Sequence, residues 1–234
     1  MAVRESRPDR VLLQTLRLPA GMGIDVGLNG TAPPPAPYHW LPSRIRQASS
    51  KRRPALAASF CARRALSRAG YAGTAKVKTG PDGPAIWPEG WTGSIGCADI
   101  GAVAVAAPSH AGEWLGVDLS VPLTELQRRW LEPLLATRAE LEALTSRSTE
   151  TLSLLYSAKE ALQRALQPLL GEIPDYQAMR CVRMDGEWLW FEPAVDMDPH
   201  WPAQRLVKVR YLSTREWVLT VVASLQQTNW EQTD

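Results

Sequence analysis

The chain has 234 residues, a formal net charge of +2 and 45% hydrophobic residues, which suits one large or two small globular domains. No apolar run approaches the roughly 18 residues that a membrane span needs, and the N-terminus does not resemble a secretory signal. The three cysteines form no C-x-x-C pair, which argues against a disulfide framework and a structural zinc site. We therefore expect a cytoplasmic protein without a membrane partner.

Positive charge is concentrated in the N-terminal third of the chain. Residues 27–81 contain ten basic residues and no acidic residue, which leaves sixteen basic and twenty-four acidic residues elsewhere. Such a block predicts a polyanionic ligand, which can be nucleic acid, a nucleotide-like cofactor or an acidic partner. The alternative interpretation is a solvated helical face. No nucleic-acid-binding motif accompanies the block, so we expect no nucleic-acid partner.

The predicted elements begin with a strand over residues 11–18 and a proline-rich loop over residues 27–37. A helical pattern covers residues 43–69, where Pro54 either starts a second helix in its first turn or kinks a single helix. Gly70 follows this pattern and is expected to end the helix.

The middle of the chain is expected to supply neighbouring strands. Residues 79–93 are rich in turn-forming glycine and proline. The apolar runs over residues 101–107 and 114–119 then predict two strands that pair through a tight turn at residues 108–112.

The C-terminal portion changes from helices to strands. Apolar periodicity predicts three helices, and turn signals predict two hairpins. The helices cover residues 122–134, 137–144 and 149–169, and the strands cover residues 179–184, 187–191, 205–212 and 216–225. This order predicts an α+β fold in two halves of similar size, residues 1–112 and residues 113–234.

Candidate chemistry lies at the end of one predicted strand and on one predicted helix. Asp118 ends a short apolar strand, and Glu160 and Arg164 lie one turn apart on one helical face, next to Lys159. Each residue alone has a structural alternative, since Asp118 can initiate a turn and Glu160 can form an exposed pair with Arg164. Together, two carboxylates on rigid elements can hold a hard divalent cation, and a neighbouring ammonium can hold phosphate. The combination predicts phosphate-ester chemistry.

Five motifs occur in the order and spacing of a known family. They are the basic residues 51–53 with Cys61–Leu66, the segment Gly80–Pro88 with Gly93–Ile95, Gly116–Leu119, Tyr156–Leu162 and Ile173–Tyr176. Together they resemble the 4′-phosphopantetheinyl transferase superfamily, of the type that includes enterobactin synthase component D and the surfactin-type enzymes. The resemblance covers residues 51–176.

The resemblance implies a pseudo-twofold arrangement of two similar α+β halves with the active-site cleft between them. It implies transfer of 4′-phosphopantetheine from coenzyme A to a serine of an acyl or peptidyl carrier protein, with Mg²⁺ as the cofactor. The expected enzyme is monomeric and cytoplasmic, and it serves secondary-metabolite or siderophore carrier proteins. Such a reaction depends on charge neutralisation and alignment more than on a covalent nucleophile.

In the C-terminal half, the resemblance assigns the metal to Asp118 and Glu160, with Ser120 at the position of a third ligand. Glu160 is also expected to help deprotonate the incoming serine, and Lys159 shares the catalytic role. Lys159 and Arg164 are expected to steady phosphate charge.

In the N-terminal half, the resemblance implies contacts with the coenzyme. Ser94 is expected near the diphosphate, and Cys97 occupies the position of a phosphate-contacting histidine. The basic residues expected to face the phosphates of the nucleotide or the acidic carrier are Lys51, Arg52, Arg53, Arg63 and Arg64.

Several positions depart from the family pattern. The family commonly reads Gly-Ser-[IL]-[ST]-His where this chain has Gly96 and Cys97 at the last two positions. The metal strand usually reads Asp-x-Glu, and Ser120 occupies the place of the glutamate. The N-terminal helix usually carries Gly-Arg where this chain reads Ala58 and Ser59. Three hypotheses follow: a divergent transferase, a relative that binds carriers without transfer, or an enzyme of the same fold that acts on another substrate.

Cys97 itself has two interpretations. It can be a nucleophile activated by neighbouring basic residues, or a small residue that fills the space of the missing histidine. The second interpretation is favoured because no histidine is placed in the sequence to activate the thiol.

Overall fold

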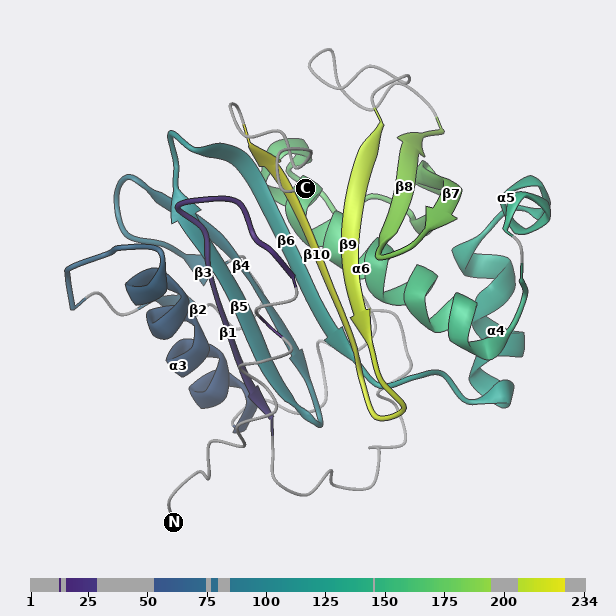
Figure 1. Ribbon diagram of the computed structural model, residues 1–234, viewed down its shortest axis with the longest axis horizontal. Coiled ribbons are helices and arrows are strands. Elements are labelled where there is room, and N and C mark those ends of the chain that lie inside the picture. The colour runs from purple at the N-terminus through teal and green to yellow at the C-terminus, as the bar shows by residue number, and fades with distance from the viewer. Residues whose placement is uncertain are drawn as a thin grey trace. The chain divides into compact units, whose positions relative to one another are not determined.

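The computed structural model describes residues 13, 16–28, 53–74, 77–79, 85–144, 146–194 and 206–225 (Figure 1). The chain divides into two compact units, the first made of Met1–Leu115 with Ala223–Asp234 and the second made of Gly116–Val222. Antiparallel sheets and separate helices confirm the predicted α+β class. The pseudo-twofold relationship stays a prediction. Within the described part of the chain, no helix is both long and apolar enough to cross a bilayer.

The first unit is built on a three-stranded antiparallel sheet with the strand order β1-β5-β4 and a separate two-stranded pair, β2-β3. Its elements are β1 (Gly23–Leu28), α3 (Arg53–Arg68), β2 (Lys78–Thr79), β3 (Ala85–Ile86), β4 (Trp91–Ala98) and β5 (Gly101–Pro108). The register places Ser94 of β4 opposite Val105 of β5 and Cys97 opposite Ala102.

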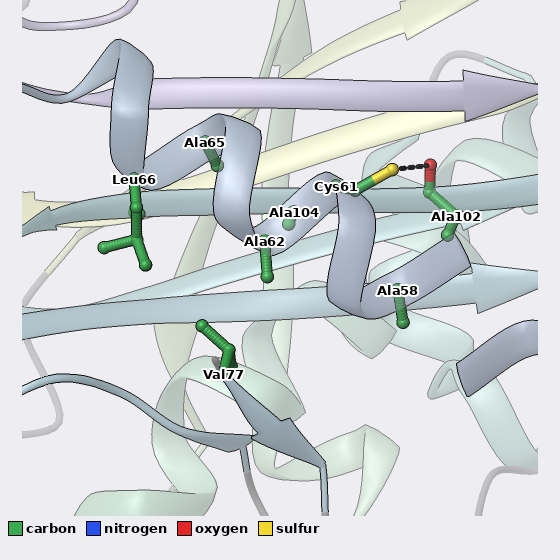
Figure 2. Packing of buried hydrophobic residues seen from close by; sticks show 9 residues of the cluster. Ala58, Cys61, Ala62, Ala65, Leu66, Val77, Ala102 and Ala104 are labelled. Atoms are coloured by element: carbon green, nitrogen blue, oxygen red, sulfur yellow. Dashed lines mark hydrogen bonds between the residues drawn. The ribbon is translucent and has the colours of Figure 1, made fainter. Parts of the chain in front are cut away.

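Helix α3 packs against this sheet through small side chains (Figure 2). Ala62 and Ala65 on the helix are fully buried, as are Ala102 and Ala104 on β5. The thiol of Cys61 donates to the carbonyl oxygen of Ala102 over 3.5 Å. Alanines on both surfaces let the helix approach the strands closely, so the contact area comes from backbone proximity more than from large side chains.

The elements from Gly112 onward form a five-stranded sheet with the order β6-β10-β9-β8-β7 and the helices that accompany it. They are β6 (Gly112–Ser120), α4 (Glu125–Leu135), α5 (Arg138–Ala143), α6 (Thr149–Leu170), η1 (Tyr176–Ala178), β7 (Met179–Asp185), β8 (Trp188–Pro193), β9 (Val207–Ser213) and β10 (Val218–Leu225). Helix α6 packs against β9, β7, η1 and α4.

Polar residues at the helix ends explain where these helices begin and stop. Thr124 caps α4 in a reciprocal pair with Gln127, and the side chains of Thr137 and Ser148 cap α5 and α6. Gly171 ends α6 in the left-handed conformation, with φ of 72°, which glycine adopts without steric cost. All three predicted helices and both predicted hairpins of this part of the chain are confirmed, with ends shifted by a few residues.

Two predictions in the N-terminal half are wrong. Within residues 11–18, Leu13 is helical and Leu16 lies in a turn, and the first strand that the structure describes is β1. Leu16 is fully buried, so its apolar side chain reflects burial, and periodicity in so short a run cannot separate a strand from a helix. Strand β5 pairs with β1 on one edge and with β4, from which a two-residue turn separates it, on the other. Both edges of β5 are therefore already hydrogen-bonded, and the predicted pairing with β6 does not form.

The predicted helix over residues 43–69 is confirmed from Arg53 onward, and residues 43–52 lie outside the described part of the chain. Pro54 falls in the first turn of α3, which is the first of the two alternatives for this proline. Gly70 follows the helix with φ of 99°, as expected for a glycine that ends it.

Candidate functional site

Gly116 brings the strand that carries Asp118 into direct contact with α6. A Cβ atom at this position would lie 2.0 Å from the backbone oxygen of Ala161, which is less than any real contact. Only glycine lets β6 approach the helix this closely. The glycine of the Gly-Val-Asp motif therefore sets the spacing between Asp118 and the residues that follow Tyr156 in the helix.

Arg164 joins the two candidate metal ligands. Its Nη1 atom donates to Oδ1 of Asp118 over 2.7 Å, and its Nη2 atom donates to Oε2 of Glu160 over 3.0 Å. Nη1 also donates to the carbonyl oxygen of Val117 over 3.3 Å. The structure thus brings Asp118 and Glu160, which are 42 positions apart in the sequence, to the two arms of one guanidinium.

Neutral hydroxyl groups bind the other oxygen of each carboxylate. Ser157 donates to Oδ2 of Asp118 over 2.8 Å and lies 3.0 Å from the hydroxyl of Thr220, while Tyr176 donates to Oε1 of Glu160. We call Asp118, Ser157, Glu160, Arg164, Tyr176 and Thr220 the carboxylate–arginine cluster. Its acids are almost completely buried, and the side chain of Arg164 is its most exposed member at 22%.

The electrostatics of the cluster follow from this geometry. Burial by itself lowers the pKa of Arg164, but the charges of Asp118 and Glu160 outweigh it and raise that pKa above its usual value. Arg164 therefore stays a cation at any physiological pH. Two carboxylates and one guanidinium leave the cluster with a formal charge of −1.

The donor set of the cluster suits a hard cation. Asp118 and Glu160 offer carboxylate oxygens, and Ser120 follows Asp118 at the next position on the same face of β6. The Ser120 hydroxyl oxygen is buried and has no hydrogen-bond partner among the residues that the structure describes, so it can accept one. In the same part of the chain, no group of three or more His, Cys, Asp or Glu side chains is placed to hold a metal. Carboxylate and hydroxyl oxygens are ligands that Mg²⁺ accepts, and Mg²⁺ usually keeps several of its waters.

Lys159 lies away from this cluster, in the interior of the second unit. Its ammonium is 2.8 Å from a carboxylate oxygen of Glu140 and donates to the carbonyl oxygen of Leu135 over 2.6 Å. The same carboxylate accepts the backbone N–H of Cys181 over 2.7 Å. Burial lowers the pKa of Lys159, and the charge of Glu140 opposes this shift. Adjacent positions on a helix diverge by about 100°, so Lys159 and Glu160 contact different surroundings.

The candidate coenzyme residues of the first unit lie on β4. Ser94 is buried, and Cys97 is half-buried and is not part of a disulfide. A Cβ at Gly93 would lie 2.5 Å from the ring of Trp87 and 2.4 Å from the carbonyl oxygen of Val105. Trp87 and Gly93, which belong to the same motif, therefore pack against each other. The absence of a side chain at Gly93 makes room for the indole ring next to Ser94.

The basic residues of α3 have different surroundings. Arg64 lies 3.2 Å and Arg68 lies 2.5 Å from Oδ1 of Asp25, which is buried on β1. Arg63 is exposed and lies 5.8 Å from the ring centre of Phe60, which is itself 48% exposed. Asp25 therefore balances part of the positive charge that the acid-free block suggested, and Arg63 points to solvent.

The side chains of three basic candidates lie outside the described part of the structure. Lys51 and Arg52 lie outside the described residues, and Arg53 begins α3 without a described side chain.

Sequence reasoning named the acids but missed the residues that hold them. Ser157 lies inside the Tyr-Ser-x-Lys-Glu motif, and Tyr176 ends the last of the five motifs, yet neither received a role. Glu140 and Thr220 lie in segments without a motif, so the sequence carried no signal for them.

Comparison with known proteins supports the superfamily for part of the chain. Residues 42–107 match the family described as 4′-phosphopantetheinyl transferase N-terminal domain. The match includes α3, β4 and nearly all of β5. No curated protein matches the chain.

Proposed function

We propose that this protein transfers 4′-phosphopantetheine from coenzyme A to a serine of an acyl or peptidyl carrier protein, with a divalent cation, in secondary metabolism. The main support for this proposal is that Asp118 and Glu160 both bind the guanidinium of Arg164. The reaction needs two acids that lie close enough together to bind one cation. The family match over residues 42–107 supports a transferase of this class independently, because it ends before either acid.

In the proposed reaction, the serine oxygen of the carrier forms a bond to the phosphorus that bears the pantetheine arm. The bond from that phosphorus to the bridging oxygen breaks, and the nucleotide part of coenzyme A leaves with the electron pair. Glu160 takes the proton of the serine, and Arg164 balances charge on the phosphate oxygens. A divalent cation held by Asp118, Glu160 and Ser120 would neutralise diphosphate charge when bound.

Tyr176 and Ser157 have positioning roles in this proposal. Each donates to one carboxylate oxygen, which fixes the orientation of Glu160 and Asp118. Lys159 receives a positioning role as well, because its ammonium is buried against Glu140. Its ammonium ties α6 to the end of α4 and to Glu140 of α5, and Glu140 in turn accepts a hydrogen bond from β7. These bonds hold the helix that presents Glu160.

The first unit supplies the proposed coenzyme contacts. Arg63, with its exposed side chain, is the strongest candidate for a phosphate of the nucleotide, whereas Arg64 is already paired with Asp25. Ser94 and Cys97 remain candidates near the diphosphate.

The direct test incubates the purified protein with coenzyme A, Mg²⁺ and several apo carrier proteins, and measures the intact mass of each carrier. We expect one carrier to gain a single phosphopantetheine arm. Glu160→Gln is expected to slow the transfer by about a hundredfold or more. Glu142→Gln is the matched control, because Glu142 is an exposed acid of α5 that pairs with Arg138 one helical turn away.

Other outcomes would support the alternative hypotheses. Coenzyme A binding without mass gain on any carrier would contradict transfer and favour a different reaction in the same fold. Carrier binding without coenzyme A binding would favour a relative that recognises carriers but does not modify them.

A further inference from the structure

Arg164 holds the same carboxylate oxygens that a cation would need. Its two arms bind Oδ1 of Asp118 and Oε2 of Glu160, and the remaining oxygens accept from Ser157 and Tyr176. The protein alone therefore already places positive charge between the two acids. A second cation that binds these oxygens must share them with a guanidinium or displace it.

It is unfavourable for a divalent cation and the guanidinium to share these carboxylate oxygens, because the two positive charges repel each other at such short distances. Displacement is possible because the guanidinium lies at the end of a long side chain that has other rotamers available. It is also the most exposed member of the cluster, so a cation that arrives from solvent meets Arg164 before the buried acids.

We infer that Arg164 is a built-in counter-cation that competes with divalent cations for Asp118 and Glu160. With the guanidinium in place, the acids are paired and the cation site is closed. With a cation in place, Arg164 is released and can turn toward an anionic ligand. The release toward a diphosphate rests on the proposed function, whereas the competition involves only the protein and the cation.

The test measures Mn²⁺ binding to the full chain by electron paramagnetic resonance, without coenzyme A and without a carrier. We expect Arg164→Gln to bind Mn²⁺ at least about tenfold more tightly than the wild type, because the competing charge is gone. Arg138→Gln changes the net charge equally at an exposed arginine of α5 and should bind Mn²⁺ as the wild type does. Adding Asp118→Asn to Arg164→Gln should remove the gain.

Equal or weaker Mn²⁺ binding by Arg164→Gln, or a gain that survives Asp118→Asn, would overturn the inference. A second measurement needs no variant, in case Arg164→Gln does not fold. In the ¹⁵N-labelled wild type, saturating Mg²⁺ should move the Arg164 guanidinium resonances and speed the exchange of their protons with water, and unchanged resonances under Mg²⁺ that binds would also overturn the inference. Because neither readout requires transfer, a failed carrier assay and a failed competition test can be told apart.

Discussion

The Lys159 ammonium lies 2.8 Å from a carboxylate oxygen of Glu140, and both side chains are 1% exposed. The carboxylate also accepts the backbone N–H of Cys181, and the ammonium donates to the carbonyl oxygen of Leu135. Each charge is thus buried with a partner, and removal of one partner leaves the other buried and uncompensated.

This pair predicts strongly coupled losses of stability. Lys159→Met or Glu140→Gln alone should reduce the free energy of unfolding by about 3–5 kcal/mol, measured by urea denaturation. The double variant should lose less than the sum of the two, by about 1–3 kcal/mol, because neither charge is then left alone. The exposed pair Arg138 and Glu142 provides the control cycle, with changes within about 0.5 kcal/mol. Additive losses in the buried cycle would show that the two charges do not depend on each other.

Gly116→Ala should separate the strand of Asp118 from α6. The added Cβ would meet the backbone oxygen of Ala161 at 2.0 Å, and a backbone atom cannot rotate away as a side chain can. We expect a loss of about 2–3 kcal/mol in the free energy of unfolding and a fall in Mn²⁺ affinity. Gly171→Asn is the control, because Gly171 has open space around it and asparagine tolerates the left-handed conformation. Wild-type stability of Gly116→Ala would mean that β6 and α6 are not in close contact.

The sequence predicted the helices and hairpins of the second unit well, because apolar periodicity and turn residues are local signals. Asp185-Gly186, for example, needs no distant partner to be recognised as a turn. The strand partners of β5 were predicted less well, because β1 lies far from β5 in the chain and an apolar run does not show whether it pairs with the strand before it or the strand after it. The strand predicted over residues 11–18 was wrong because an apolar residue can be buried outside a strand, as Leu16 is in its turn.

In the candidate site too, contacts between residues near each other in the sequence could be predicted, and contacts between distant residues could not. The i, i+4 spacing placed Glu160 and Arg164 on one face, and the structure confirms that they form an ion pair. No local pattern showed that Arg164 also reaches Asp118, because that contact depends on the close approach at Gly116. Likewise, the motif that contains Lys159 did not reveal its buried partner, since Glu140 lies in a separate short helix.

The buried thiols predict a loss of stability at alkaline pH. Burial, with the nearby Asp25 charge, raises the pKa of Cys61 from 9.0 to about 12, and burial, with Glu140, raises that of Cys181 to about 12. Between pH 9 and pH 12 the unfolded thiol has lost its proton while the folded thiol keeps it. Since the folded state then binds more protons, stability falls as the pH rises, by about 1.4 kcal/mol per pH unit and per thiol.

Urea midpoints at pH 8 and pH 10.5 measure this dependence. In Cys61→Ala and in Cys181→Ala, the free energy of unfolding should fall less between the two pH values than in the wild type. It should fall least in the double variant, even if each variant is less stable at pH 8. Equal slopes in the wild type and in the double variant would contradict the proposed protonation of the buried thiols.

Ser120→Glu should strengthen cation binding at the carboxylate–arginine cluster. The Ser120 hydroxyl is buried without a hydrogen-bond partner among the described residues, and it lies two positions after Asp118 on the same face of β6. A third carboxylate there should raise Mn²⁺ affinity by about tenfold through its charge. Ser120→Gln has nearly the same size without the charge and should leave the affinity close to that of the wild type. Equal affinities in the two variants would place the Ser120 side chain outside the cation site.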